Sequence, residues 1–93
     1  MRRVTLIALL LLTLGTAWAQ DGAAVYKSKC AHCHGAQGQG KHGPKLAGTS
    51  LSEDDIVNVL TKGGQPKAPH TKPYSGVNEA TAKQVAAYVK TLK

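Results

Sequence analysis

The feature that most constrains this chain is a short run of two cysteines and a histidine, Cys30-Ala31-His32-Cys33-His34. The C-x-x-C-H spacing is typical of covalent attachment of a c-type haem, in which both thiols add to the porphyrin and the histidine ligates iron. Residues three apart are neighbours on a helical turn, so Cys30 and Cys33 can reach one edge of a flat ring. His34 follows directly and can reach the metal. The motif predicts one covalently bound haem with His34 as an axial ligand.

Two other interpretations of the motif remain open. A C-x-x-C pair can be a redox dithiol or a disulfide, but that motif accompanies a βαβ pattern, which this chain lacks. A zinc site needs four tetrahedral ligands, and Cys33 and His34 are adjacent, so they cannot easily face one small ion together. We interpret His32 as a spacer, because its neighbours already fill the ligating roles.

The N-terminus has the pattern of a secretory signal peptide. Arg2 and Arg3 precede an apolar stretch over residues 4–14, and Ala17-Trp18-Ala19 matches an A-x-A cleavage site. Residues 4–14 are too few to cross a bilayer, which takes about 20 apolar residues. We therefore predict a signal peptide over residues 1–19, a single domain over 20–93 without a transmembrane segment, and a periplasmic or otherwise exported protein. An uncleaved N-terminal anchor is the alternative.

The predicted mature chain is basic. The sequence has 12 basic residues and 5 acidic ones, and loss of Arg2 and Arg3 leaves ten lysines and a net charge of +5. A positive surface can steer a protein toward redox partners with acidic docking surfaces, whereas solubility is an equally simple reason for dispersed lysines. Dispersed lysines without arginine argue against a nucleic-acid partner. We expect a monomer.

The predicted domain is short of core residues. Phenylalanine is absent, and the single tryptophan, Trp18, lies in the predicted signal peptide. Chains of this size often need a cofactor or another staple to fold. We therefore expect the haem to supply the missing apolar bulk and the apoprotein to be largely unfolded.

The first two predicted helices flank a glycine-rich loop. The first runs over about residues 22–31, with Asp21 as its N-cap, a glycine suited to close helix contact and a tyrosine on the face of Cys30. Residues 35–50 form a loop whose glycines let the backbone approach a porphyrin. A ligating histidine usually donates its second N–H to a fixed acceptor, and we expect the Pro44 carbonyl to accept it from His34. The glycine of this first helix is Gly22, and the tyrosine is Tyr26. We expect Pro44 and Leu46 to form walls of the haem site.

Two further helices complete an all-α pattern. Ser52 and Asp55 form a capping pair for a helix with an apolar stripe, which stops at Gly63-Gly64. A proline-stiffened loop follows over residues 65–76, and Asn78 can cap a last helix over about residues 79–92. The stripes consist of Ile56, Val59 and Leu60 in the former helix and of Ala82, Val85, Ala86, Val89 and Leu92 in the latter.

These elements resemble a class I c-type cytochrome, a small single-haem electron carrier. The likeness rests on Cys30 to Gly35, on Gly43-Pro44-x-Leu46-x-Gly48, on the helix from Ser52 and on the run Ala86 to Leu92, with Tyr26 before the haem motif. It implies a small cytochrome c-like fold with three main helices and two long loops around one haem c. It also implies that the first and last helices cross near Gly22 and Tyr88 and that the Pro44 carbonyl orients His34. From its spacing to Cys30, we expect Tyr26 to pack near the haem or against the helix that crosses it, and we count Tyr26 and Tyr74 among the cofactor-binding residues.

The chain departs from the family at the second axial ligand. The family pattern has a methionine in the loop before the last helix, but Met1 is the only methionine here. Alignment on Pro73-Tyr74-Ser75-Gly76 puts Lys72 in its place, with His70 two residues earlier. We favour His70, because neutral imidazole suits iron, over an open or water-filled site, Lys72 or His42.

The resemblance predicts a one-electron carrier between redox partners, not an enzyme. Methionine raises the potential of a c haem, so imidazole in its place predicts a low potential. Two alternatives remain: a gas- or peroxide-reactive haem protein with an open distal side, and the cytochrome component of a larger redox enzyme.

Overall fold

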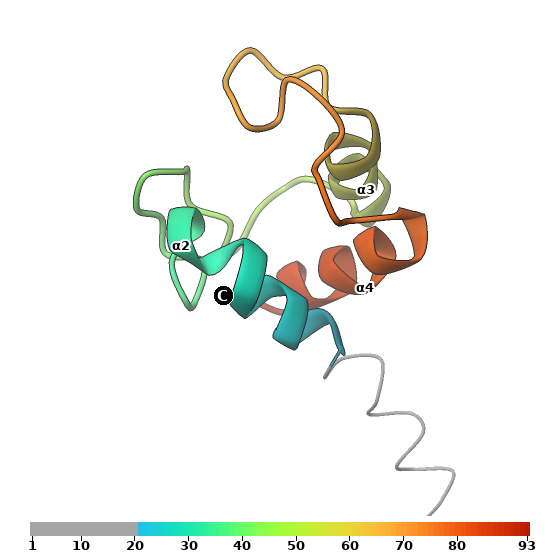
Figure 1. Cartoon of the computed structure of the whole chain (residues 1–93). Coiled ribbons are helices and arrows are strands. Elements are labelled where there is room, and N and C mark those ends of the chain that lie inside the picture. The colour runs from blue at the N-terminus through green and yellow to red at the C-terminus, as the bar shows by residue number, and fades with distance from the viewer. Residues whose placement is uncertain (1–20) are drawn as a thin grey trace, which may run out of the picture.

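The computed structural model describes residues 21–93, and over that range it is helical, with no strand (Figure 1). Residues 21–29 form the first helical segment, followed by α2 (Ala31–His34), α3 (Glu53–Lys62) and α4 (Glu79–Val89). Loops over residues 35–52 and 63–78 join α2 to α3 and α3 to α4. The all-α prediction with two long loops is confirmed, while the predicted signal peptide over residues 1–19 lies outside the described residues.

The first helix differs from its predicted bounds at both ends. Residue 21 is already helical, so Asp21 is not the N-cap, which is by definition the flanking non-helical residue. A turn at Cys30 separates residues 21–29 from the single turn of α2. Gly35 ends α2 as expected, with φ of 88°, and its N–H donates to the carbonyl of Ala31 over 2.8 Å.

The capping pair of α3 is present as predicted. The Asp55 N–H donates to Ser52 Oγ over 3.1 Å, and the Ser52 N–H donates to Asp55 Oδ2 over 3.1 Å. These two bonds satisfy backbone donors that the helix itself leaves free. Gly63 is the C-cap, and its N–H donates to the carbonyl of Val59 over 3.0 Å.

The last helix, α4, begins as predicted and ends earlier. Asn78 Oδ1 accepts from the Thr81 N–H over 2.8 Å, which confirms the N-cap. The helix ends at Val89, not at Leu92, because the chain tightens into three-residue turns there. The N–H of Thr91 donates to Tyr88 O over 2.9 Å, and the N–H of Leu92 to Val89 O over 3.0 Å.

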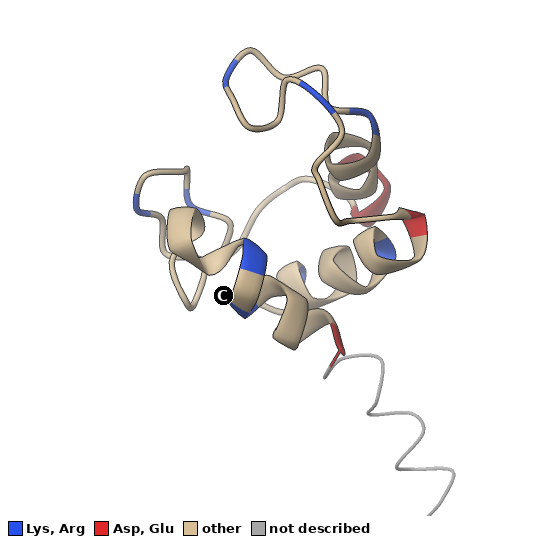
Figure 2. Ribbon diagram, in the orientation of Figure 1, with Lys and Arg blue, Asp and Glu red and all other residues tan. Residues whose placement is uncertain are grey.

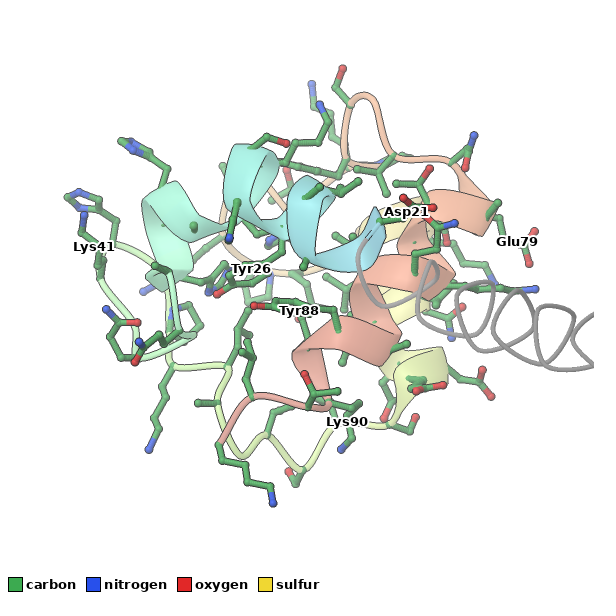
Figure 3. All side chains as sticks on the ribbon, turned by 90° about the horizontal axis from the view of Figure 1, so that it is seen from below. Asp21, Tyr26, Lys41, Glu79, Tyr88 and Lys90 are labelled. Atoms are coloured by element: carbon green, nitrogen blue, oxygen red, sulfur yellow. The ribbon has the colours of Figure 1, made fainter. Side chains whose placement is uncertain are left out.

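The first helix and α4 cross at Gly22. A Cβ on Gly22 would meet the carbonyl of Gln84 and lie 3.1 Å from Tyr88 Cβ, so only glycine permits this approach. Next to the crossing, the rings of Tyr26 and Tyr88 have centroids 5.3 Å apart (Figure 3). Tyr26 is completely buried, and its hydroxyl donates to the carbonyl of Gly35 over 2.7 Å. The expected crossing at Gly22 and Tyr88 is present.

One hydrophobic cluster joins the first helix, α3 and α4. Its buried members are mostly small: Tyr26, Ile56, Leu60, Val77, Ala82, Val85, Ala86 and Val89. The apolar faces of α3 and α4 pack together and also face a cavity, described below. Among residues 21–93, no helix is both long enough and apolar enough to cross a membrane.

Candidate haem-binding site

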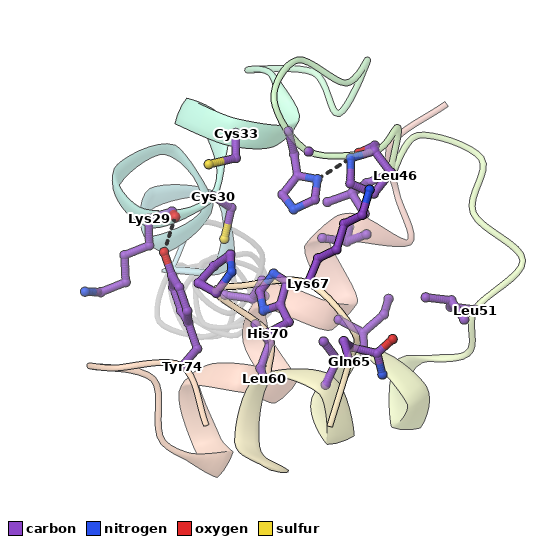
Figure 4. A pocket seen from close by; sticks show the side chains of 18 of the residues that line it. Lys29, Cys30, Cys33, Leu46, Leu51, Leu60, Gln65, Lys67, His70 and Tyr74 are labelled. Carbon is purple, nitrogen blue, oxygen red and sulfur yellow. Dashed lines mark hydrogen bonds between the residues drawn. The ribbon is translucent and has the colours of Figure 1, made fainter. Parts of the chain in front are cut away.

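A cavity of about 450 Å³ lies between the cysteine motif, the two loops and the apolar faces of α3 and α4 (Figure 4). Its volume falls within the range of about 300–1,000 Å³ that is usual for cofactor sites. Most of its wall is apolar. Its lining includes Lys29, Cys30, Cys33, His34, His42, Pro44, Leu46, Gln65, Lys67, His70 and Tyr74.

Both cysteines of the motif line this cavity as free thiols. Cys30 and Cys33 are half-buried, and neither forms a disulfide within the described chain. Burial raises the pKa of the Cys30 thiol to about 11, with a further contribution from Cys33 and an opposing one from Lys29. At neutral pH the Cys30 sulfur is therefore protonated and uncharged. A thioether at this sulfur would remove the ionisable group.

His34 is held in one orientation by the loop that follows it. Its Nδ1–H donates to the carbonyl of Pro44 over 2.8 Å, as expected from the sequence. Because a carbonyl oxygen only accepts, this bond places the proton on Nδ1 and leaves Nε2 free to ligate a metal. A Cβ on Gly43 would lie 2.8 Å from His34 Cε1, so the glycine makes room for the ring.

His70 comes from the other loop and also lines the cavity. The ring centroids of His34 and His70 are 6.2 Å apart, and the ring planes are inclined by 22°. A metal–imidazole bond of about 2.0–2.1 Å, with the ring centre about 1.1 Å beyond the nitrogen, gives two opposed imidazoles on one ion a centroid separation of about 6.3 Å. The observed centroid separation of 6.2 Å is close to this value.

The environment of His70 favours a neutral imidazole. Burial lowers the pKa of His70, and the proximity of His34 lowers it further. A neutral ring is the form that binds metal. However, His70 Nδ1 is buried without a hydrogen-bond partner, so His70 lacks the anchor that Pro44 gives to His34.

Tyr74 links the loop of His70 to the first helix. Its ring centroid lies 5.5 Å from that of His70, and its hydroxyl donates to the carbonyl of Lys29 over 2.9 Å (Figure 4). Burial raises the pKa of Tyr74, with smaller contributions from Cys30 and Cys33. Tyr74 thus stays protonated at neutral pH and keeps this donor.

Some of the other predicted site residues line the cavity, and others do not. Pro44 and Leu46 line the cavity, whereas Tyr26 lies in the core against Tyr88. Lys72 is not among the lining residues. His42 lines the cavity but is exposed, and its ring centroid lies 5.9 Å from that of His32.

Sequence reasoning missed four polar residues of the wall, Lys29, Thr49, Gln65 and Lys67. The position of Lys29 directly before the cysteine motif was the one sequence signal that could have indicated its role. Gln65 and Lys67 lie in a proline-rich loop without periodicity, so nothing in the pattern indicated where they face. Among residues 21–93, no three His, Cys, Asp or Glu side chains are grouped so that they could hold a bare metal ion, as the zinc interpretation requires.

Comparison with known proteins agrees with this geometry. A family described as cytochrome c oxidase, cbb3-type, subunit III matches residues 17–89. The chain belongs to the cytochrome c family. It is 34% identical over 76 residues to a cytochrome c-553-like protein of Synechocystis, with 80% of this chain and 69% of the relative covered. It is also 34% identical over 89 residues to cytochrome c-554(547) of Halothiobacillus neapolitanus, with 81% of this chain and 97% of the relative covered. No solved structure gives a significant match.

As a cytochrome c, the protein carries covalently attached haem c. The residues around the cavity fit that group, since two free thiols and two imidazoles line one largely apolar space. Cys30 and Cys33 are the residues that would tether it, and His34 is the residue that would ligate its iron from the side of the cysteine motif.

Proposed function

We propose that this cytochrome is an exported, monomeric one-electron carrier of low potential, whose haem iron is ligated by both His34 and His70. The observation that carries the proposal is the 6.2 Å separation of the two imidazole centroids at the cavity. Neutral imidazole is a suitable iron ligand, and the lowered pKa of His70 supports that protonation state. Residues 1–19 would direct export as a signal peptide.

In this proposal the protein's residues bind, orient and shield the cofactor. Haem c supplies a one-electron Fe(III)/Fe(II) couple. Cys30 and Cys33 fix the ring at one edge, while the Pro44 carbonyl keeps His34 Nε2 directed at the metal. With His70 as the second ligand, no position remains for a substrate, and the protein acts as a carrier.

The axial pair determines the potential. Methionine opposite histidine raises the potential of a c haem, and the described chain offers no methionine. His70 would therefore give a lower midpoint than a methionine ligand. Lys29 and Lys67 line the cavity, and lysines lie on both loops (Figure 2), which supports docking by redox partners with acidic surfaces.

The test compares His70→Ala with the matched control His42→Ala, which removes an exposed imidazole of the same cavity. We expect the parent holoprotein and His42→Ala to be low-spin, with a near-infrared band typical of two imidazole ligands and little binding of carbon monoxide in the reduced state. His70→Ala should become high-spin and bind carbon monoxide. A parent midpoint typical of His/Met cytochromes, or an unchanged spectrum in His70→Ala, would contradict the proposal.

One observation favours a second candidate, a haem protein with an open distal side that reacts with gases or peroxide. Ligating histidines almost always donate their second N–H, and His70 Nδ1 has no acceptor. In that case the parent itself binds carbon monoxide at neutral pH. A role as a component of a larger redox enzyme is the third candidate, since the matching family is described by an oxidase subunit; purification of the parent with stoichiometric partner chains would favour it.

A further inference from the structure

The segment that carries His70 is a closed loop tied to the end of α3. The N–H of Gly64 donates to Thr71 O over 3.2 Å, and the N–H of Gln65 donates to His70 O over 2.9 Å. Beyond the loop, the N–H of Tyr74 donates to Leu60 O over 2.8 Å. Backbone bonds thus hold His70 at a fixed place relative to α3, although its own side chain has no hydrogen-bond partner on Nδ1.

Gly63 is the point where α3 touches this loop most closely. A Cβ at Gly63 would lie 2.5–2.6 Å from the N, C and O atoms of Lys72, which is closer than real Cβ contacts allow. The atoms in its way are backbone, so no side-chain rotation can relieve the contact. Gly63 also has φ of 71° and is anchored to Val59 through its N–H.

The next residue offers a natural comparison. Gly64 has φ of 83°, so it shares the left-handed backbone that favours glycine. A Cβ at Gly64 would meet nothing within 4 Å. The two glycines differ in what a side chain would meet: at Gly63 it must displace the backbone of Lys72, two residues after His70, whereas at Gly64 it extends into open space.

We propose that Gly63 is a positioning residue for the second axial ligand. Because Gly63 lacks a side chain, the end of α3 can lie directly against the backbone of Lys72. In that position the ring centroid of His70 is 6.2 Å from that of His34. Functional side chains need placement within about 0.5 Å of their productive geometry, and a Cβ at Gly63 forces a displacement of that size. The inference rests on the proposed ligation by His70.

The first experiment compares the holoproteins of Gly63→Ala and Gly64→Ala, with attached haem checked by mass. Carbon monoxide must displace His70, so weaker ligation by His70 appears as tighter binding of carbon monoxide to the reduced protein. For Gly63→Ala we expect about a 10- to 100-fold gain in carbon monoxide affinity, a high-spin fraction in the oxidised spectrum and a shifted midpoint. Gly64→Ala should match the parent in all three, although it too places an alanine at a positive φ.

The second experiment repeats Gly63→Ala in a His70→Ala background. With the ligand removed, the additional change should leave carbon monoxide affinity and spin state unaltered, because nothing remains to be positioned. This cycle separates the two proposals. If His70→Ala alone leaves the parent spectrum unchanged, the proposed function fails; if it opens the iron but Gly63→Ala behaves as Gly64→Ala does, only the role of Gly63 fails.

Two further results would overturn the role of Gly63. One is an equal gain in carbon monoxide affinity from Gly63→Ala with and without His70, which would mean a general loosening of the site. The other is failure of Gly63→Ala to accumulate as holoprotein in both backgrounds, which would assign Gly63 to folding of the chain.

Discussion

At the scale of single residues, the two histidines of the cavity differ in how their second nitrogen is used. His34 Nδ1 is fixed by the Pro44 carbonyl, while His70 Nδ1 is buried without a partner. A hydrogen bond to the second nitrogen holds a ligating ring in place and raises its basicity. His70 should therefore dissociate from the haem iron more easily than His34.

Acid provides the test of this difference. Burial and His34 lower the pKa of His70 below its ordinary value of 6.5, which the unfolded chain retains. The unfolded chain thus binds more protons, so the stabilising contribution of neutral His70 is full above about pH 6.5 and is lost as pH falls through the lower native pKa. We expect carbon monoxide affinity of the reduced protein to rise as pH falls through the lowered pKa of His70, because a protonated ring cannot ligate iron.

The matched control for this pH profile is again His42→Ala, which should keep the acid transition of the parent. His70→Ala should bind carbon monoxide equally well across the same range. A parent whose affinity falls on acidification, or a transition that persists in His70→Ala, would assign the effect to another group.

At the scale of the elements, one glycine decides how closely the first helix and α4 approach. Gly→Ala in an open helix is stabilising by about 1 kcal/mol. At Gly22 the added methyl would meet the carbonyl of Gln84 and the side chain of Tyr88, and overpacking costs about 1–3 kcal/mol or more. We expect the contact to outweigh the propensity, so that Gly22→Ala lowers the guanidinium unfolding midpoint of the holoprotein.

The exposed Ala24 on the same helix provides the control. Ala24→Gly measures the propensity change alone and should cost about 0.5–1 kcal/mol. If Gly22→Ala raises the unfolding midpoint instead, the two helices can separate at little cost and the crossing does not hold them together.

Local signals in the sequence were sufficient for some elements and not for others. Ser52 with Asp55, and Asn78, give caps that depend on neighbouring residues only, so the starts of α3 and α4 were predictable. The break at Cys30 and the early end of α4 depend on turns for which the pattern carries no signal.

Some features of the candidate site could likewise be predicted from the sequence, and others could not. The bond from His34 to Pro44 follows from a motif and a short loop, so it could be expected. The positions of Lys67 and Lys72 depend on how the loop over residues 63–76 folds back on α3. The alignment put Lys72 in the place of the family's methionine, whereas the backbone of Lys72 lies close to Gly63 and its side chain is not among those that line the cavity.

At the scale of the whole molecule, the helices are arranged around a cavity that the side chains do not fill. Acidic residues lie near the starts of α3 and α4, and lysines lie on the loops, the first helix and α4, so none of the charge of the described residues is gathered in the core (Figure 2). The buried cluster contains one large side chain, Tyr26, and otherwise mostly valine and alanine. Without the cofactor, the mostly apolar wall of this cavity of about 450 Å³ would face water, which costs free energy in proportion to the apolar area left exposed. A typical small domain has a stability of only about 5–15 kcal/mol, so losing this burial is a large penalty.

The protein should therefore fold only around its cofactor. In Cys30→Ala/Cys33→Ala apoprotein, with absence of haem checked by mass and absorbance, we expect low helicity and no cooperative thermal transition by circular dichroism, whereas the parent holoprotein should melt in one step. His34 and His70 remain in this variant, so added haemin should bind without thioethers and restore helicity. A cooperative transition before haemin is added would mean that Tyr26 and the aliphatic side chains of α3 and α4 suffice as a core. Folding that appears only with haemin would mean that the cavity itself is what the apoprotein cannot tolerate.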